Sequence, residues 1–359
     1  MKNYKLNIDK EFQFKDFSKY VLGADIGGTR TNIAVAGIKN NKLKIFLTYE
    51  FQTKTIKSII PILDLILKDV LEKYKIEIKQ ACLAVAGTIE KKDSYVKLTN
   101  ANLDIDINKV KKITSIKNIF LINDFQAIGY AINIIKKGEL FEIKPNKTKN
   151  NKSEKKIIIG AGTGLGKSLL VYNQKEGIFQ PLSSEGGHSD FPVQTDYELQ
   201  LTEYIKKINH TNEPLCYEEL LSGRGILNIY NFLINNKEFS ENKITQEIKN
   251  SNQKTELISK YRKKDPACKK TFDLFTKFFA RCVKNYALET IPFSGIYIAG
   301  GIATKNHEIF LNNLFTTEFY NSDKRRELLK KIPIYLIKNY DISLKGACFA
   351  AYKKFEENK

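Results

Sequence analysis

Short apolar runs separated by turn residues dominate the first part of the chain. They lie at residues 20–26, 32–38, 43–51 and 81–87. Their length and their β-branched content predict buried strands. The close spacing of the first three predicts a meander with Gly27 and Gly28 in its first turn. Apolar residues at helical spacing predict an amphipathic helix over 56–75, and residues 1–20 are expected to form a polar lead-in.

A further apolar run, at 118–122, leads directly into Asn123 and Asp124, and a helical pattern follows. This order predicts a buried strand, a polar pair at its carboxyl end and then a helix. In open α/β sheets, ligands bind outside the carboxyl ends of the strands. A carboxylate at that place can accept a proton from a hydroxyl group. Asp124 is therefore a candidate general base, and the alternative is that it only caps the helix behind it.

The second half of the chain partly repeats this pattern. Strands are predicted at 157–159, 168–172 and 332–337, a strand followed by a turn at 296–302, and helices over most of 196–291 and at 346–351. A glycine turn at 160–166 joins the first two of these strands, as in the first half, which indicates a duplicated architecture. Two polar segments, at 144–156 and 235–256, are expected to lie on the surface. Strands and helices that alternate in this way predict an α/β fold.

The composition indicates a globular protein of about two domains. The chain has 359 residues, of which 42% are hydrophobic and 11% aromatic, as in ordinary folded proteins. The formal net charge is +19, and the lysines are spread over the whole sequence. A nucleic-acid footprint clusters instead on one face or in one tail. We therefore expect no nucleic-acid partner.

Cysteine spacing and apolar run length exclude several classes. The five cysteines are scattered singly, without a CxxC pair, so neither a zinc site nor a disulfide framework is indicated. Reduced thiols are the simplest interpretation. The N-terminal residues lack the apolar region of a signal peptide, and no apolar run reaches the length of about 18 residues that a membrane span needs. A cytoplasmic protein without a membrane partner is expected.

The first glycine turn, Asp25-Ile26-Gly27-Gly28-Thr29, places a carboxylate at a strand end before two glycines and a hydroxyl. Glycine lets backbone N–H groups approach phosphate oxygens, because no Cβ intervenes. Asp25 could hold Mg²⁺ directly or through water. The alternative is a hairpin turn that needs glycine only for its backbone conformation.

The second turn, at 160–166, has four glycines in seven residues, which favours a ligand very close to the backbone. Residues 161–168 also match a relaxed Walker A pattern that ends in Gly166-Lys167-Ser168. A true P-loop is followed by a helix, whereas strand-like residues follow here. Neither turn has the spacing of a dinucleotide fingerprint.

Three further stretches are weaker candidates on their own. Glu185 and His188 lie three residues apart across two glycines and could bind vicinal hydroxyl groups, although a lone histidine is often structural. Glu218 precedes a Ser-Gly turn and could equally be a solvated helix residue. Gly300 and Gly301 follow a strand and could lie against a nucleoside, but a plain turn is the simpler interpretation.

Together, six motifs resemble those of bacterial-type glucokinases, the ATP:glucose phosphotransferases of the actin-like, ribonuclease-H-like ATPase superfamily. In chain order they are Asp25-Ile26-Gly27-Gly28-Thr29, Ile122-Asn123-Asp124-Phe125, the turn at 160–166, Glu185-Gly186-Gly187-His188-x-Asp190-Phe191, Glu218-x-x-Leu221-Ser222-Gly223 and Ala299-Gly300-Gly301-Ile302. They span residues 21 to about 350. The resemblance implies two ribonuclease-H-like (actin-like ATPase) α/β domains with a sugar and ATP cleft between them. The smaller domain would comprise 1–134 and about 342–359, and the larger, with helical insertions, 135–341.

The resemblance also implies the reaction and the roles of the residues. Mg-ATP would phosphorylate the 6-hydroxyl of glucose at the start of glycolysis, giving glucose 6-phosphate and ADP, and the protein would be a homodimer. Asp124 would be the general base, Asn123 would bind nearby sugar hydroxyls, and Glu185, His188 and Glu218 would hold the hydroxyls at the other end of the ring. The residues implied for the nucleotide are Asp25, Gly27, Gly28 and Thr29 at a first phosphate site with Mg²⁺, Gly162, Thr163 and Gly164 at a second, and Gly300 and Gly301 at the adenosine.

Two departures from the family pattern stand out. Leu103 ends the stretch Thr99-Asn100-Ala101-Asn102-Leu103, where the family usually has Trp, and Arg224 replaces a frequent Pro. The cysteine-rich zinc motif of the related repressor and kinase family is missing. A kinase for another hexose or an N-acetylhexosamine, and an inactive sugar-sensing regulator, are the alternative functions.

Overall fold

The computed structural model describes residues 4–40, 42–87, 89–90, 94–98, 102–145 and 153–356. The chain divides into two compact units. Unit 1 comprises Met1–Lys137, Tyr172–Ser183 and Asp341–Lys359, and unit 2 comprises Gly138–Val171 and Ser184–Tyr340. In the described ranges, no helix has both the length and the apolarity that crossing a membrane requires.

The main sheet of unit 1 has the order β1-β4-β3-β2-β5-β9. Its strands are β1 (Tyr4–Ile8), β2 (Lys19–Ile26), β3 (Arg30–Lys39), β4 (Lys42–Gln52), β5 (Gln80–Val85) and β9 (Asn118–Asn123). The antiparallel pairs β2–β3 and β3–β4 confirm the predicted meander, and β5 and β9 continue the sheet in parallel with β2. The polar lead-in was wrong in part: β1 pairs with β4, because Tyr4 and Leu6 pack against the core.

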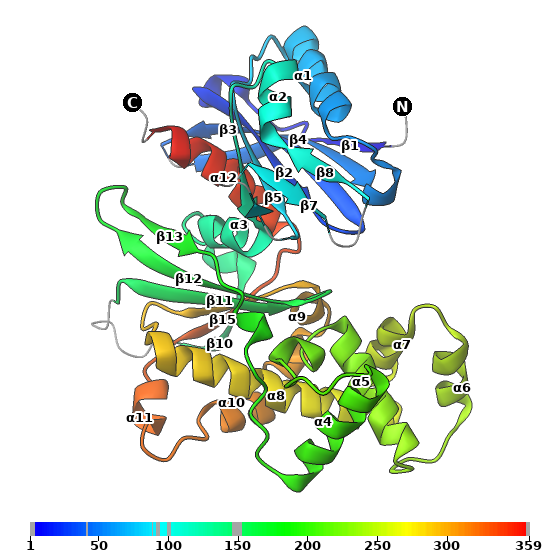
Figure 1. Cartoon of the computed structure of the whole chain (residues 1–359). Helices are drawn as coiled ribbons and strands as arrows, with labels where there is room; N and C mark the ends of the chain where they lie inside the picture. Colours follow the sequence, from blue (N-terminus) through cyan, green and yellow to red (C-terminus); the bar gives the residue numbers. More distant parts are fainter. Residues whose placement is uncertain are drawn as a thin grey trace. The chain divides into compact units, whose positions relative to one another are not determined.

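Helices cover both faces of this sheet (Figure 1). On one face, α1 (Ile60–Tyr74) and α2 (Ile107–Ile113) share a core with alternate residues of β2, β3 and β5. On the other, α3 (Asp124–Ala131) packs closely against α12 (Ile342–Glu356). A small sheet of β6 (Ile89–Glu90), β7 (Tyr95–Lys97) and β8 (Asp104–Asp106) lies between β5 and α2 in the chain.

The second six-stranded sheet has the order β10-β15-β14-β11-β12-β13. Its strands are β10 (Leu140–Lys144), β11 (Lys155–Ala161), β12 (Leu165–Asn173), β13 (Ile178–Leu182), β14 (Ile296–Ala299) and β15 (Ile334–Ile337). The hairpin β11–β12 encloses the second glycine turn, and a strand follows that turn, which confirms that it is no P-loop. Within the polar segment predicted at 144–156, residues 146–152 lie outside the described residues.

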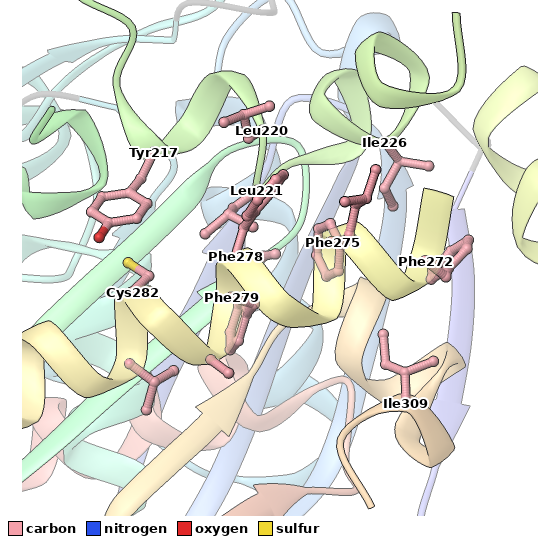
Figure 2. Packing of buried hydrophobic residues seen from close by; sticks show 14 of the residues in the cluster. Tyr217, Leu220, Leu221, Ile226, Phe272, Phe275, Phe278, Phe279, Cys282 and Ile309 are labelled. Carbon is pink, nitrogen blue, oxygen red and sulfur yellow. The ribbon is translucent and has the colours of Figure 1, made fainter. Parts of the chain in front are cut away.

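Unit 2 also contains the predicted helical part of the chain. Its helices are α4 (Asp196–Ile208), α5 (Gly223–Asn235), α6 (Lys243–Asn250), α7 (Lys254–Tyr261), α8 (Pro266–Thr290), α9 (Gly301–Lys305), α10 (Asn313–Phe319) and α11 (Arg326–Leu329). Figure 2 shows α8 placing Phe275, Phe278 and Phe279 in the core of the unit. The surface excursion at 235–256 contains α6, which buries Ile248.

Candidate functional site

The acidic residues predicted in unit 1 lie at one edge of its sheet. Asp25 on β2 is in register with Ala84 on β5, and Ala84 with Ile122 on β9. Because these three strands are parallel, their carboxyl ends meet at the same edge. Asp124 follows β9 directly, so the two carboxylates that the sequence singled out come from neighbouring parts of one edge.

Burial, together with repulsion between neighbouring acids, controls the protonation of Asp25 at this edge. Burial and the nearby charge of Asp124 raise the pKa of Asp25 to about 7, Asp341 raises it further, and the Ser343 hydroxyl lowers it. That buried hydroxyl makes no hydrogen bond of standard geometry. Asp341 has a raised pKa itself, through burial and the charge of Glu50. An unliganded edge of this kind favours the protonated form of Asp25.

The residues at this edge suit a magnesium ion that also contacts phosphate. The amide oxygen of Asn32, in register with Asp25, is buried without a hydrogen-bond partner. A divalent cation would relieve the repulsion at Asp25, and carboxylate oxygens are ligands that Mg²⁺ prefers. The described residues contain no group of three or more His, Cys, Asp or Glu arranged to hold a metal. This fits Mg²⁺, which usually takes one or two carboxylates and completes its shell with water and phosphate.

The structure separates the two roles considered for Asp124. Asn123 is the N-cap of α3: its side chain accepts the N–H of Phe125 at 2.8 Å and forms a capping box with Gln126. Asp124 is the first helical residue, and its Oδ1 also accepts the Phe125 N–H, at 2.9 Å. The capping role expected for Asp124 thus belongs mainly to Asn123, which fixes the start of α3 and therefore the place of the half-buried Asp124.

The first glycine turn is held by backbone and hydroxyl hydrogen bonds. Gly27 N–H donates to the Arg30 oxygen at 2.9 Å, and the Thr53 hydroxyl donates to the Gly27 oxygen at 2.7 Å. Within the described part of the chain, the N–H groups of Gly28 and Thr29 have no hydrogen-bond partner. Two open donors beside a carboxylate are what a phosphate and its metal ion require.

Two glycine turns of unit 2 lie at adjacent strand ends. β11 and β14 are parallel, with Gly160 in register with Ala299, so the turn at 162–164 and the pair Gly300-Gly301 follow neighbouring strands. Gly300 has φ of +91°, and a Cβ there would lie 2.5 Å from the Ala161 oxygen. Only glycine fits this position.

The turn at 162–164 is tied to a predicted sugar ligand. Glu218 Oε2 accepts the N–H of Leu165 at 2.9 Å, and a Cβ on Gly164 would lie 2.5 Å from the same oxygen. Gly164 therefore makes room for a carboxylate, a reason that the phosphate argument from sequence did not contain. The N–H groups of Thr163 and Gly164 have no partner among the residues that the structure describes, so the turn still offers donors.

The other predicted sugar ligands lie on a 3₁₀ turn beside Glu218. Glu185 and His188 are exposed, with 3.9 Å between Glu185 Oε2 and His188 Nε2. His188 Nδ1 lies 3.9 Å from the Cys216 thiol. The N–H of Tyr217 donates to the Ser189 oxygen at 2.9 Å. Unit 2 thus brings together the Glu185–His188 turn, the Glu218 segment and the second glycine turn.

Several residues at these places escaped the sequence reasoning. Asp341 approaches Asp25 from the opposite end of the chain, where no local signal marks it. Arg224, a departure from the family pattern, lies 2.7 Å from Glu219 and 3.8 Å from Glu218 between the charged atoms. The other departure, Leu103, is a buried core residue, while Thr99, Asn100 and Ala101 before it lie outside the described residues.

Comparison with known proteins gives one consistent result. The chain matches the glucokinase family over residues 22–354. It is 33% identical to the glucokinase of Nostoc punctiforme over 348 residues, which cover 92% of this chain and 98% of the relative. The solved glucokinase of an Antarctic psychrotroph has a TM-score of 0.77 and 25% identity, covering 93% and 99% of the two chains. That of Balamuthia mandrillaris, in complex with glucose, has a TM-score of 0.76 and 22% identity, covering 93% and 94%. The predicted actin-like α/β fold of two domains is confirmed, and the chain belongs to the glucokinase family.

Proposed function

We propose that this protein is an ATP-dependent glucose kinase in which Asp124 is the general base. The observation that carries the proposal is the placement of Asp124 at the carboxyl end of β9, at the same sheet edge as Asp25. Transfer of a γ-phosphoryl group to a sugar hydroxyl needs a carboxylate at the acceptor and charge neutralisation at the phosphates. Asp124 would supply the carboxylate, and Mg²⁺ held by Asp25 would neutralise the phosphate charge.

In the proposed mechanism, Asp124 accepts the proton of the glucose 6-hydroxyl as that oxygen attacks the γ-phosphorus in line with the leaving oxygen. Most of the catalysis comes from positioning and from charge neutralisation. Asn123 contributes through its cap, which orients the first turn of α3 and Asp124 with it. Its amide nitrogen remains a donor for a sugar hydroxyl.

Glu185, His188 and Glu218 are proposed to hold the remaining sugar hydroxyls. One carboxylate oxygen of Glu218 is already occupied by the Leu165 N–H, which leaves the other to accept from a hydroxyl. Glu185 and His188 are exposed on their turn and can accept and donate, respectively.

The nucleotide is proposed to bind at the glycine turns. Open N–H groups at Gly28 and Thr29, and at Thr163 and Gly164, would donate to phosphate oxygens, and Gly300 with Gly301 would lie against the adenosine. Asp25 would hold Mg²⁺, which when bound neutralises charge on the phosphates.

Other parts of the assignment stay predictions from the sequence. They are the cytoplasmic location, the homodimer, the place at the start of glycolysis and the division into domains at 1–134 with about 342–359, and 135–341. The family match supports a hexose kinase over a sugar-sensing regulator without catalysis, and a kinase for another hexose or an N-acetylhexosamine is the alternative for the substrate.

A coupled ADP-release assay separates these functions. It would compare glucose, fructose, mannose, N-acetylglucosamine and no sugar at fixed Mg-ATP. The proposal predicts ADP release that depends on glucose and exceeds that with the other sugars. A preference for another sugar would reassign the substrate, and no sugar-dependent ADP would favour the regulator.

A further inference from the structure

Lys167 is a buried lysine that the proposed mechanism does not use. It lies on β12, and only 6% of it is exposed. None of the ion pairs found among the described residues involves the Lys167 ammonium group. Burying an ammonium group costs several kcal/mol unless partners compensate for the lost water. A buried lysine without an acid therefore needs another explanation.

The partners of Lys167 are two aromatic faces and a thiol. Its Nζ lies 5.2 Å from the ring centre of Tyr217 and 5.3 Å from that of Tyr286. Burial raises the pKa of the nearby Cys282 thiol, and the positive charge of Lys167 lowers it. Figure 2 shows the Tyr217 ring and the Cys282 thiol directed toward the same space. Cation–π contacts of this kind stabilise an ammonium group that has lost its water.

Lys167 lies directly beneath the Glu185–His188 turn. A Cβ on Gly186 would lie 2.9 Å from Lys167 Cδ and 3.6 Å from its Nζ. The next residue, Gly187, passes over the same strand: a Cβ there would lie 1.9 Å from the Leu165 oxygen. The turn therefore rests on β12 at Leu165 and at Lys167, and its two glycines permit that approach.

The same lysine supports the Glu218 segment. Tyr217, whose ring packs on the ammonium group, precedes Glu218 in the chain and donates its N–H to Ser189 of the other segment. Leu165, two residues before Lys167, donates its N–H to Glu218. Lys167 is thus the side chain on which both segments with proposed sugar ligands rest.

We propose that Lys167 is a positioning residue for the sugar site, fixing the Glu185–His188 turn and the Glu218 segment relative to each other. The inference rests on the proposed function only for the identity of the ligand. It also explains the Walker-A-like letters Gly166-Lys167-Ser168 without a P-loop, since the lysine points into an aromatic cage instead of toward a nucleotide.

The test compares Lys167→Met with a matched control, Lys156→Met. Methionine keeps the length of the side chain and removes its charge. Lys156 lies on the adjacent strand β11, is also largely buried, and packs on the ring of Tyr297 at 5.6 Å, away from both segments. Lys167→Arg, which keeps the charge and stacks on aromatic rings, is the rescue variant.

For Lys167→Met we expect the glucose KM to rise about tenfold, since a lost cation–π contact of about 1.4 kcal/mol corresponds to that factor. The ATP KM should stay within about twofold, and Lys167→Arg should restore most of the glucose affinity. The melting temperature should change by less than about 5 °C, because losing the cation–π contacts is offset by no longer burying a charge. Hydrogen exchange should speed up at the amides of residues 186–190 and 217–219 without any substrate, whereas Lys156→Met should leave both KM values and this exchange unchanged.

Three results would overturn the inference. One is an unchanged glucose KM with unchanged exchange in both segments. Another is an equal rise in both KM values, which would indicate general damage. The third is failure to fold or a fall in melting temperature of more than about 5 °C, which would make Lys167 a stability residue. If wild-type protein shows no glucose-dependent turnover, the proposed function fails instead, and the exchange measurement still decides the role of Lys167.

Discussion

Replacing Asp25 with Asn should stabilise the protein without ligands while abolishing its proposed metal site. Burial and the nearby Asp124 raise the pKa of the Asp25 carboxyl from 3.8 to about 7. Asn keeps the shape and cannot ionise. The variant therefore tests whether Asp25 contributes to stability or, at a cost in stability, to the proposed metal site.

The magnitude follows from proton linkage. Below about pH 4 the carboxyl is protonated in the folded and the unfolded chain alike, so it contributes no difference. Between about pH 4 and 7 the folded chain keeps the proton that the unfolded chain has lost, so stability falls as the pH rises. Each pKa unit corresponds to about 1.4 kcal/mol. A shift of about three units, reduced because Asp25 is partly exposed, gives a loss of about 2–4 kcal/mol at pH 8.

Urea unfolding at several pH values between 4.5 and 8, with EDTA and without nucleotide, measures this loss. Asp25→Asn should gain about 2–4 kcal/mol over wild type at pH 8 and almost nothing at pH 4.5. Asp16→Asn, which removes an exposed carboxylate, is the control. If Asp25→Asn keeps the pH dependence of wild type, or is less stable at pH 8, the account of a buried Asp25 beside other acids is wrong.

Two further substitutions test unit 2. Arg281 is fully buried, 2.8 and 2.9 Å from the two oxygens of Glu198 and 3.3 Å from Glu318, so Arg281→Met should lower the free energy of unfolding by about 3–5 kcal/mol. A loss below about 1 kcal/mol in urea unfolding would contradict the importance of this network. Gly164→Ala should raise the glucose KM about tenfold, because the new Cβ displaces the Glu218 carboxylate. Glu218→Gln should then add little further change in the double variant, and independent, additive effects would refute the link.

Patterns among neighbouring residues predicted much of the fold. The β2–β3–β4 meander, the strand-to-helix junction at Asn123 and Asp124, and the β11–β12 hairpin were all predicted, because alternation, glycine turns and helical spacing are properties of adjacent residues. β1 was missed, since a few alternating apolar residues become a strand only through pairing with β4.

Contacts in the site between residues that are far apart in the sequence could not be predicted in this way. Nothing near Asp341 indicates that it approaches Asp25. The glycine at 164 was attributed to phosphate, whereas Glu218, over fifty residues away, is the group that occupies the space of its Cβ. In the sequence, Lys167 stood out only as part of a Walker-A-like pattern. The rings that surround its ammonium group belong to Tyr217 and Tyr286, which lie far from it in the sequence.

The account rests most directly on Asp124 as the general base. The decisive measurement is the kcat for glucose-dependent ADP release by Asp124→Ala and Asp124→Asn, with glucose binding followed separately by calorimetry. A lost general base lowers kcat by about 10²–10⁴-fold, while glucose should still bind, though more weakly. A kcat near that of wild type in either variant would contradict the mechanism.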